Sequence, residues 1–480
     1  MYRLPFFYDY VTPNYAMPNA SITELGIINY LHTRHSNRMQ NNDSFFEQSL
    51  ESNINPLTFV FDNSLGTWPS SAFGTHLMSG PYLEIVEGYE DSVFFGKRHN
   101  HRYIYPIKVS PHFDDFTGVT NIGSKLNGEY FWKHISAEVL KDVQHGRALI
   151  FLDYAQENFI ERDSYCRLHE CLKHSGIPKD QIILAFNSFN AKELYEKWFS
   201  EEERQLQVWD WPWVSANTSY FYNQMAYCRL NQEDLESTRS VLRKNHFLFK
   251  IRRPRAHRRA FLYQMYQDNL LEKIDWSWIT PVQFNNDHVV GDLGVYWNAN
   301  YNNQDIEELF KKFPHPLQDE PNDNINTISA WTDRQAEPYK NSYFYLCTET
   351  YTSGEYKSIT EKVFKPIANF QPFLFMSFPG ALQVLRDLGF QTFSPFVDES
   401  YDNEPNEAIR LQMIYSEVKR LCNMSKEEIH AGYWSMRDRL EHNQAVLLDL
   451  YKTDHRSLDL IKYLHQRVAP INTEESESHD

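Results

Sequence analysis

The chain has 480 residues, a formal net charge of −17 at pH 7 and 15% aromatic residues. Its length predicts two or three domains, and a hydrophobic content of 41% is sufficient for packed cores. The negative charge argues against a general nucleic-acid binder, because such proteins present a broad positive field. The five cysteines form no CxxC pair, and neither a signal-peptide pattern nor an apolar membrane span occurs. We therefore expect a cytoplasmic protein with reduced thiols and no transmembrane segment.

The first half of the chain alternates apolar runs with segments of helical spacing. The runs predict strands at 57–61, 103–109, 148–152, 181–186 and 206–209, and the spacing predicts helices at 22–31, 135–143, 165–174 and 191–199. The run at 148–152 has no polar alternation, as expected for a strand that is buried on both faces of a parallel sheet. This pattern predicts a Rossmann-like domain over residues 1–240.

The tryptophans after this last run allow two interpretations. An aromatic platform for a sugar ring could be formed by Trp209, Trp211 and Trp213 with Tyr220, Phe221 and Tyr222. Packing inside the core is the favoured interpretation.

A second α/β domain is predicted over residues 245–435. It begins with an apolar run at 247–251 and helical spacing at 261–270, and a further run lies at 289–295. Strands at 343–347 and 372–376 then flank a helix, which makes a βαβ unit of the kind that binds ligands at its strand ends. Helices are expected at 436–466, and the polar, acidic residues 467–480 predict a disordered tail.

A basic cluster follows the run at 247–251. Six of the ten residues from 250 to 259 are Lys or Arg, in a chain that is acidic overall. Guanidinium groups at a strand end can grip phosphate oxygens in pairs, and Pro254 stiffens the turn that presents them. The alternative interpretation is a solvated helix start or a basic patch that binds nucleic acid.

The helix between the last two predicted strands begins near Glu361 and Lys362. A carboxylate there can accept the two hydroxyl groups of a ribose, and a lysine can neutralise a diphosphate with help from the helix dipole. The same spacing is also that of a capping box, in which Ser358 and Glu361 satisfy backbone amides and nothing binds. Spacing alone does not choose between the two.

The aromatic strand 343–347 with Thr348 and Glu349, followed by Ile359-Thr360-Glu361-Lys362, resembles the donor-binding signature of the fucosyltransferase family and its bacterial and viral relatives. The resemblance covers about residues 245–395 and implies a GT-B fold, in which two Rossmann-like domains with parallel sheets face a central cleft. It implies that Glu361 holds the ribose of a nucleotide and that Lys362 holds the diphosphate.

The resemblance also implies a diphosphate contact from Arg252 or Arg253, with Arg255 close by in the same turn. It places Glu349 near the donor sugar and includes Thr360 in the donor-binding motif. The chain departs from the family after the strand, where Glu349-Thr350-Tyr351 replaces the usual Glu-Asn-Ser. This departure concerns the identity of the donor sugar more than the fold.

The expected activity is an inverting glycosyl transfer from a nucleotide-diphosphate sugar, with GDP-fucose or another GDP-sugar favoured, to a glycan or other hydroxyl acceptor. Protein cations would neutralise the leaving group, so we expect no metal cofactor, and Asp114-Asp115 is a weak metal candidate. The general base should follow a strand of the first domain, with Asp153 and Glu157 as first candidates and Asp62 behind them. The alternatives are a catalytically silent nucleotide-sugar or carbohydrate-binding protein and, less favoured, a nucleic-acid-binding protein.

Overall fold

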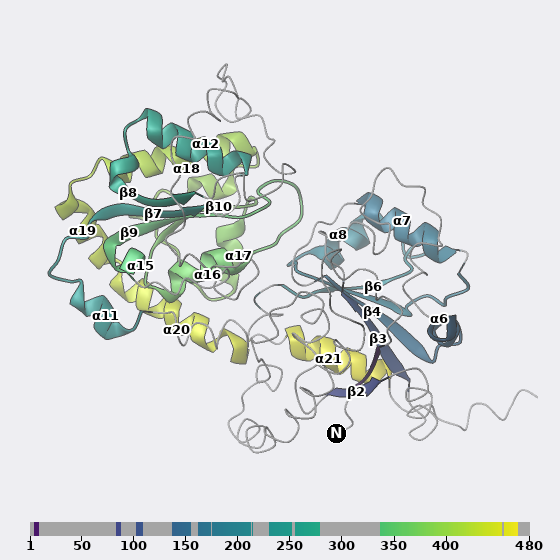
Figure 1. The fold of residues 1–480 in the computed structure, drawn as a ribbon. Helices are drawn as coiled ribbons and strands as arrows, with labels where there is room; N and C mark the ends of the chain where they lie inside the picture. Colours follow the sequence, from purple (N-terminus) through teal and green to yellow (C-terminus); the bar gives the residue numbers. More distant parts are fainter. Residues whose placement is uncertain are drawn as a thin grey trace, which may run out of the picture. The chain divides into compact units, whose positions relative to one another are not determined.

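A computed structural model shows how the chain is divided. It describes residues 4–8, 83–87, 102–108, 137–154, 162–173, 175–212, 214, 230–251, 255–278, 337–453 and 456–468. Two compact units are present (Figure 1). The first unit combines Met1–Tyr220 with Tyr451–Asp480 and is therefore assembled from both ends of the chain, whereas the second unit, Phe221–Leu450, is continuous in sequence.

A four-stranded parallel sheet forms the centre of the second unit. Its strands, in the order β10-β9-β7-β8, are β7 at Asn245–Ile251, β8 at Ile274–Trp278, β9 at Ser342–Thr348 and β10 at Phe373–Met376. Every residue of β9 and of β10 is buried, because helices cover both faces of the sheet. The predicted strands at 247–251, 343–347 and 372–376 are therefore confirmed.

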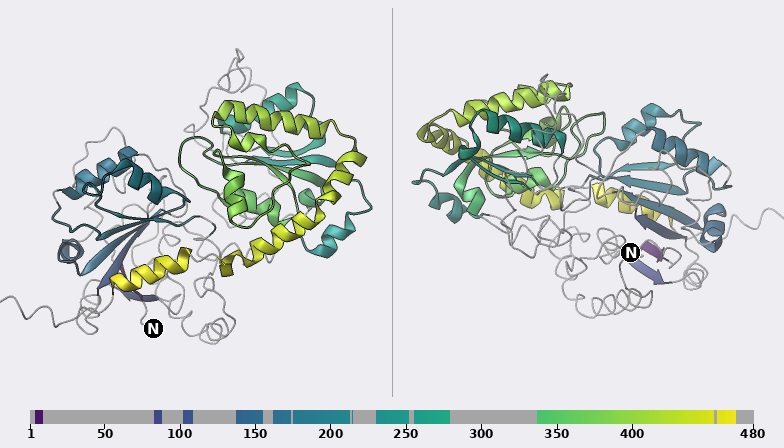
Figure 2. Two further views of the ribbon diagram at one scale, coloured as in Figure 1. Left: turned by 180° about the vertical axis from the view of Figure 1, so that it is seen from behind. Right: turned by 45° about the horizontal axis from the view of Figure 1, so that its top comes forward.

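Helices cover the two faces of this sheet. Figures 1 and 2 show α12 (Ala256–Gln267) and α18 (Glu407–Cys422) on one face, and α15 (Glu337–Asn341) and α16 (Glu361–Ala368) on the other. The part of the unit that the structure describes also contains α11 (Gln232–Ser237), α17 (Ala381–Asp387), α19 (Lys426–Ser435) and α20 (Arg437–Thr453), with short 3-10 turns η4 (Leu271–Lys273) and η7 (Ser400–Asn403). The layered α/β class is thus confirmed for this unit.

The strand order changes direction between β7 and β9. From β7 the chain passes through α12 to β8 on one side, and from β9 it passes through α16 to β10 on the other. Both helices therefore begin beside the carboxyl ends of these two central strands. Open α/β sheets bind their ligands at such a switch point.

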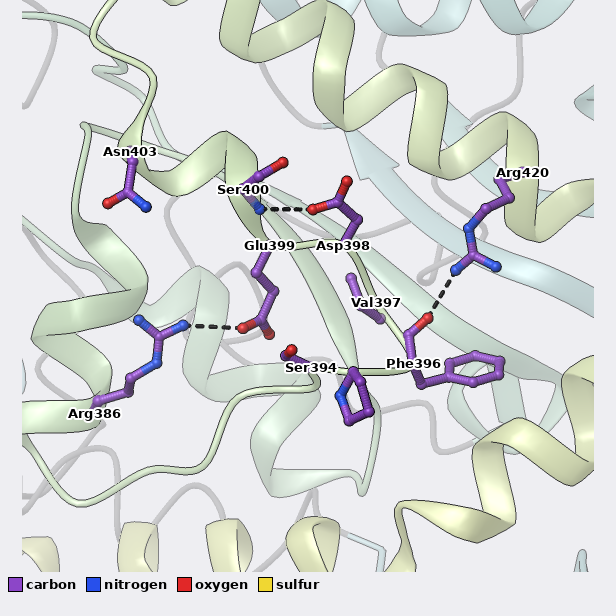
Figure 3. A pocket seen from close by; sticks show the side chains of 10 residues that line it. Arg386, Ser394, Phe396, Val397, Asp398, Glu399, Ser400, Asn403 and Arg420 are labelled. Carbon is purple, nitrogen blue, oxygen red and sulfur yellow. Dashed lines mark hydrogen bonds and ion pairs between the residues drawn. The ribbon is translucent and has the colours of Figure 1, made fainter.

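The segment after α17 covers the edge strand β10. The backbone N–H of Phe375 donates to the hydroxyl of Tyr401 at 3.2 Å, so this amide of the edge strand has a hydrogen-bond partner outside the sheet. Figure 3 shows a hollow of about 600 Å³ along this segment, with Arg386 and Arg420 among its lining residues. Arg386 pairs with Glu399 at 2.9 Å and Arg420 with Glu417 at 2.6 Å. Both arginines of the hollow are therefore neutralised by carboxylates of the same unit.

The ring of Phe396 packs between β9 and α19. It stacks on Phe344, with ring centroids 6.0 Å apart, and a Cβ atom added to Gly432 would clash with it. We expect Gly432→Ala to lower the free energy of unfolding by about 1–3 kcal/mol through overpacking, although alanine normally favours a helix over glycine. Urea denaturation measures this change, and Lys426→Ala at an exposed position of α19 is the control, expected within about 0.5 kcal/mol of wild type. A Gly432→Ala chain more stable than wild type would show that Phe396 moves aside without cost.

The first unit contains a six-stranded sheet in which all the paired strands are parallel. Its strands, in the order β2-β1-β3-β4-β5-β6, are β1 at Leu4–Tyr8, β2 at Leu83–Glu87, β3 at Tyr103–Lys108, β4 at Ala148–Tyr154, β5 at Ile182–Phe186 and β6 at Gln207–Asp210. The helices among its described residues are α6 (Ala137–Gln144), α7 (Arg162–Lys173), α8 (Ala191–Trp198) and α21 (Arg456–Arg467). Two parallel sheets in an α/β chain confirm the predicted α/β class with two parallel-sheet domains.

Most of the elements predicted for the first half are confirmed, with shifts of one to a few residues at their ends. The strands β1 and β2 were not predicted. The predicted strand at 57–61, the helix at 22–31 and the run at 289–295 lie outside the described residues.

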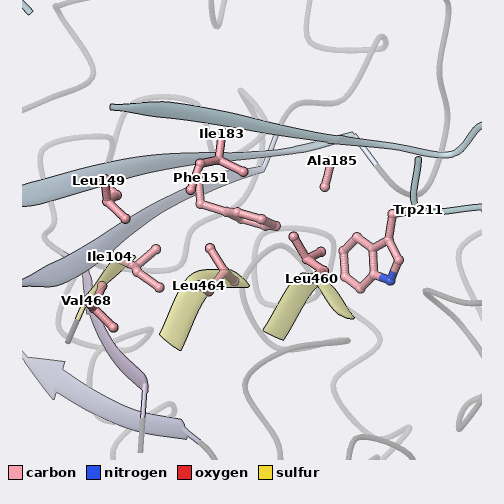
Figure 4. Close-up of a cluster of buried hydrophobic side chains, with 9 residues drawn as sticks. All are labelled: Ile104, Leu149, Phe151, Ile183, Ala185, Trp211, Leu460, Leu464 and Val468. Atoms are coloured by element: carbon pink, nitrogen blue, oxygen red, sulfur yellow. The ribbon is translucent and has the colours of Figure 1, made fainter. Parts of the chain in front are cut away.

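The last helix, α21, packs against the sheet of the first unit. Alternate residues of β5 point to opposite faces of the sheet. Ile183 and Ala185 join a buried cluster with Leu460 and Leu464 of α21 (Figure 4). Phe186 points to the other face, where its ring centroid is 5.9 Å from that of Tyr165 on α7. Helices expected together at 436–466 are thus divided, since α20 lies in the second unit up to Leu450 and α21 lies in the first. The disordered tail was predicted to begin at residue 467, but Val468 is 3% exposed in this cluster, so the packed part of the chain extends to residue 468.

Two of the tryptophans lie at the same cluster. Trp211 is 1% exposed and contacts Phe151 with centroids 6.4 Å apart, and Trp209 packs on Tyr463 at 4.9 Å. Core packing is therefore confirmed for Trp211, whereas Trp209 is half-buried against the cluster. Trp213 and residues 220–222 lie outside the described part of the chain.

Within the described ranges, no helix is both long and apolar enough to cross a membrane. Cys166, Cys347 and Cys422 are free thiols. Burial raises the pKa of Cys422 to about 12, so this thiol is protonated at neutral pH and unreactive.

Candidate functional site

Three segments of the second unit meet at the switch point between β7 and β9. They supply Arg255, His257 and Arg258 at the start of α12, Thr348 and Glu349 at the end of β9, and Thr360, Glu361 and Lys362 at the start of α16, which together are called the switch-point cluster. Side-chain contacts between Arg258 and β9, and between Glu349 and α16, join the three segments. The two distant motifs found in the sequence therefore come together.

Glu349 holds the start of α16. Its carboxylate accepts from the backbone N–H of Thr360 at 2.8 Å and from the Thr360 hydroxyl at 2.9 and 2.8 Å. Thr360 is the residue that precedes the helix, and Glu361 is the first helical residue. The interpretation of Ser358 and Glu361 as a capping box is therefore wrong, because the carboxylate that accepts from the backbone N–H at this helix start is that of Glu349, at the end of β9.

Lys362 lies between two carboxylates. Its Nζ is 3.4 Å from Glu349 Oε2 and 3.2 Å from Glu361 Oε1, and it donates to the Thr360 hydroxyl at 2.8 Å. Burial lowers the pKa of Lys362, but the two carboxylates outweigh burial and the net pKa is raised. Burial raises the pKa of Glu361, and the charges of Lys362 and Lys365 outweigh it, so that the net pKa is lowered. Lys362 and Glu361 are thus both charged at neutral pH.

These side chains differ in exposure. Glu349 is 2% exposed and Glu361 8% exposed, whereas the Lys362 side chain retains 26% exposure. Among these three side chains at the start of α16, Lys362 is therefore the most accessible to a ligand.

Arg258 joins α12 to the end of β9. Its Nε donates to the Thr348 hydroxyl at 2.9 Å, and its Nη2 donates to the carbonyl oxygens of Thr348 and Glu349 at 3.0 and 3.2 Å. The Glu349 carbonyl also accepts from His257 Nε2 at 2.9 Å, which fixes the proton of the neutral ring on that nitrogen. Burial and the charge of Arg258 hold the pKa of His257 well below its usual value, and burial lowers the pKa of Arg258 to about 10.

Arg258 is a site residue that the sequence prediction missed. Arg255 precedes it by three residues, and residues three apart lie on the same face of a helix. The basic cluster together with a helix that begins at Ala256 was the signal that could have found it.

The other predicted site residues are only partly described. Arg255 precedes α12, and its Cζ lies 6.0 Å from the ring centroid of Tyr351. Arg252 and Arg253, as well as Asp62, Glu157 and Asp114-Asp115, lie outside the described residues. The backbone of Asp153 forms part of β4 near its carboxyl end, and its side chain is not described.

The loop between β9 and α16 is anchored by α18. Arg410, 1% exposed, donates to the carbonyl oxygens of Ser377 at 3.0 Å and of Glu404 at 2.5 Å, and also to that of Thr352. The Thr352 hydroxyl in turn donates to Glu407. Arg410 was not predicted, because it is distant in sequence from the motif and carries no local signal.

Two arginines of the basic cluster are buried in α12. Arg258 and Arg259 are 5% and 4% exposed, so they do not present their charges to a long polyanion. This burial speaks against the nucleic-acid interpretation.

Among the described residues, no group of three or more His, Cys, Asp or Glu side chains is placed to hold a metal ion.

No protein-family model and no curated protein sequence matches the chain. A search of solved structures finds a trehalose-6-phosphate synthase, OtsA, which is 12% identical, with coverage of 79% of this chain and 95% of that chain and a TM-score of 0.34. A TM-score of this size supports no inference about activity. The fold class rests on the strand pairing of this chain itself.

Proposed function

We propose that this chain is a glycosyltransferase and that its switch-point cluster binds a nucleoside-diphosphate sugar. The supporting observation is that two helix starts and the cations Arg255, Arg258 and Lys362 gather at the carboxyl ends of β7 and β9. Helix N-termini attract anions through their unpaired N–H groups and dipoles, and the switch point is where open sheets bind nucleotides. A diphosphate is the ligand that suits this place.

Each residue has a proposed role. Lys362, partly exposed and oriented by two carboxylates, contacts the diphosphate, and Arg255 or an arginine of the preceding turn contacts it from the α12 side. Glu361 accepts the ribose hydroxyls, as the family resemblance implies. Glu349 is 2% exposed and accepts three hydrogen bonds from Thr360, which favours a positioning role over direct contact with the sugar.

In the proposed reaction the oxygen of an acceptor hydroxyl attacks the anomeric carbon as the bond from that carbon to the diphosphate breaks. The hydroxyl proton passes to a general base, for which Asp153 and Glu157 are the predicted candidates. The nucleoside diphosphate leaves with the extra negative charge, and Lys362 with the helix dipoles stabilises it without requiring a metal. The resemblance favours a GDP-sugar, such as GDP-fucose, as donor.

Nucleotide binding is tested with the full chain. Titration with GDP, UDP, CMP and ADP should reveal one that binds and raises the melting temperature by mass action. Glu361→Gln should weaken that nucleotide on the order of tenfold, because a hydrogen bond to a charged group contributes about 1.5–3 kcal/mol. The matched control is Glu355→Gln, which changes an exposed glutamate of the loop before α16 and should bind the nucleotide as wild type does. Absence of binding for all four nucleotides would refute the proposed function, and unchanged affinity of Glu361→Gln would place the ribose elsewhere.

Catalysis is tested separately, because a silent binding protein would pass the first test. Release of free nucleoside diphosphate from the donor should occur in the presence of EDTA, and Asp153→Asn or Glu157→Gln should abolish it. Tight binding with no release for any nucleotide sugar and hydroxyl acceptor would favour the silent protein, and loss of release with EDTA would contradict the metal-free reaction.

A further inference from the structure

The loop that follows β9 presents an aromatic ring beside the switch-point cluster. Tyr351 comes two residues after Glu349 and is 44% exposed, whereas Glu349 and Thr352 of the same segment are 2% and 4% exposed. Exposure of a large aromatic ring to water has a free-energy cost that a planar ligand packed on the ring would remove.

The backbone on both sides of Tyr351 is fixed. The Glu349 N–H donates to the Met376 carbonyl at 2.9 Å, and Thr352 is held by Arg410 and Glu407 of α18. A ring on such an anchored loop loses little conformational entropy when a ligand packs on it.

Arg255 lies next to this ring. Its Cζ is 6.0 Å from the ring centroid, in the range of a cation–π contact, and its Nε is buried without a hydrogen-bond partner among the residues that the structure describes. The contact links the ring to the residue that precedes α12 and therefore orients it at the side of the cluster where a diphosphate is proposed to bind.

We infer that Tyr351 forms a stacking subsite for the base of the nucleotide and that Arg255 positions its ring. This inference rests on the proposed function, because a nucleoside diphosphate carries its base on the ribose that Glu361 is proposed to hold. Any of the nucleotide bases can stack on an aromatic side chain, because each has a π-face. The subsite therefore contributes affinity for a nucleotide, and it contributes nothing for a diphosphate that has no base.

That difference makes the subsite testable by calorimetry on the full chain. The ligands are inorganic pyrophosphate and whichever of GDP, UDP, CDP and ADP binds most tightly. Tyr351→Ala should weaken the nucleotide by about tenfold and leave the affinity for pyrophosphate unchanged. Tyr351→Phe, which keeps the ring, should bind both as wild type does. The matched control is Tyr266→Ala, since Tyr266 is 40% exposed and lies at the opposite end of α12 from Arg255.

Arg255 is tested in the same experiment as a positioning residue. Arg255→Lys, which keeps a cation near the ring, should retain more of the preference for nucleotide over pyrophosphate than Arg255→Met does. If the two variants have the same preference for nucleotide over pyrophosphate, Arg255 does not position the ring of Tyr351.

The outcomes separate the inference from the proposed function. A Tyr351→Ala chain that binds the nucleotide as tightly as wild type does overturns the stacking subsite and leaves the proposed function intact. Equal weakening of nucleotide and pyrophosphate also overturns it, because Tyr351 would then act on the shape of the loop. A wild-type chain that binds neither ligand refutes the proposed function and the subsite together.

Discussion

Replacing Lys362 by methionine should lower the free energy of unfolding of the second unit by about 3 kcal/mol at pH 7, and by much less near pH 5. Removal of one partner from a buried ion pair typically costs about 3–5 kcal/mol, and the 26% exposure of this side chain places the effect at the lower end. Glu349 and Glu361 would be left buried without their cation.

The pH dependence follows from the signs of the pKa shifts. In the wild type the pKa of Glu361 is lowered, so its contribution to stability is present above the pKa of the unfolded chain and is lost as the pH falls through the folded value. Without Lys362, the largest charge that opposes burial at Glu361 is lost, and we expect burial to raise the pKa of this carboxyl above that of the unfolded chain. The folded variant then binds protons more readily than the unfolded variant does, and lowering the pH from 7 towards 5 restores part of its stability.

Urea denaturation at both pH values measures this effect. Lys365→Met is the matched control, since Lys365 lies on the same helix, one turn from Glu361, and forms no ion pair among the described contacts of the cluster. Its cost should be below about 1 kcal/mol at either pH. An equal loss at pH 7 and pH 5 for Lys362→Met would mean that packing of the lysine stem, and not its charge, holds the start of α16.

Replacing Arg410 by methionine should lower the free energy of unfolding by about 3–5 kcal/mol. The guanidinium donates to backbone carbonyls of Ser377, Glu404 and Thr352, which belong to three separate loops. Methionine fills much of the volume but leaves those carbonyls buried without a donor.

The control for Arg410 is on the same helix. Lys419→Met removes a cation whose side chain is 49% exposed and whose partner Asp268 is itself 22% exposed, so its cost should be below about 1 kcal/mol. Hydrogen exchange should also show faster exchange at residues 350–360 in Arg410→Met than in Lys419→Met. Similar stability of the two variants would show that water or other donors replace the Arg410 contacts.

The sequence predicted those parts of the fold that depend on continuous burial. The strands β7, β9 and β10 are uninterrupted apolar runs because both of their faces are covered. The strand β8 was missed, since Asp275 and Ser277 break its apolar run at the edge of the sheet. The strand β1 was missed as well, because Pro5 within it speaks against a paired strand.

The candidate site was predictable to the extent that its chemistry lies in short motifs. Thr360, Glu361 and Lys362 could be named from the start of a helix and from a family resemblance. The cap of that helix could not be named, because Glu349 reaches Thr360 from the end of another element and the local spacing suggested Ser358 instead. Arg410 shows the same limit, since a buried arginine that binds backbone carbonyls depends on loops that only the tertiary structure brings together.

The return of α21 to the first unit has a consequence for synthesis. Residues 221–450 of the second unit are contiguous, so they leave the ribosome as one complete folding unit. The strands of the first unit are made earlier, yet their sheet lacks the cover of Leu460, Leu464 and Val468 until residues 456–468 have followed. The unit that begins the sequence is therefore the last to be completed, and its exposed apolar face must wait through the synthesis of the entire second unit.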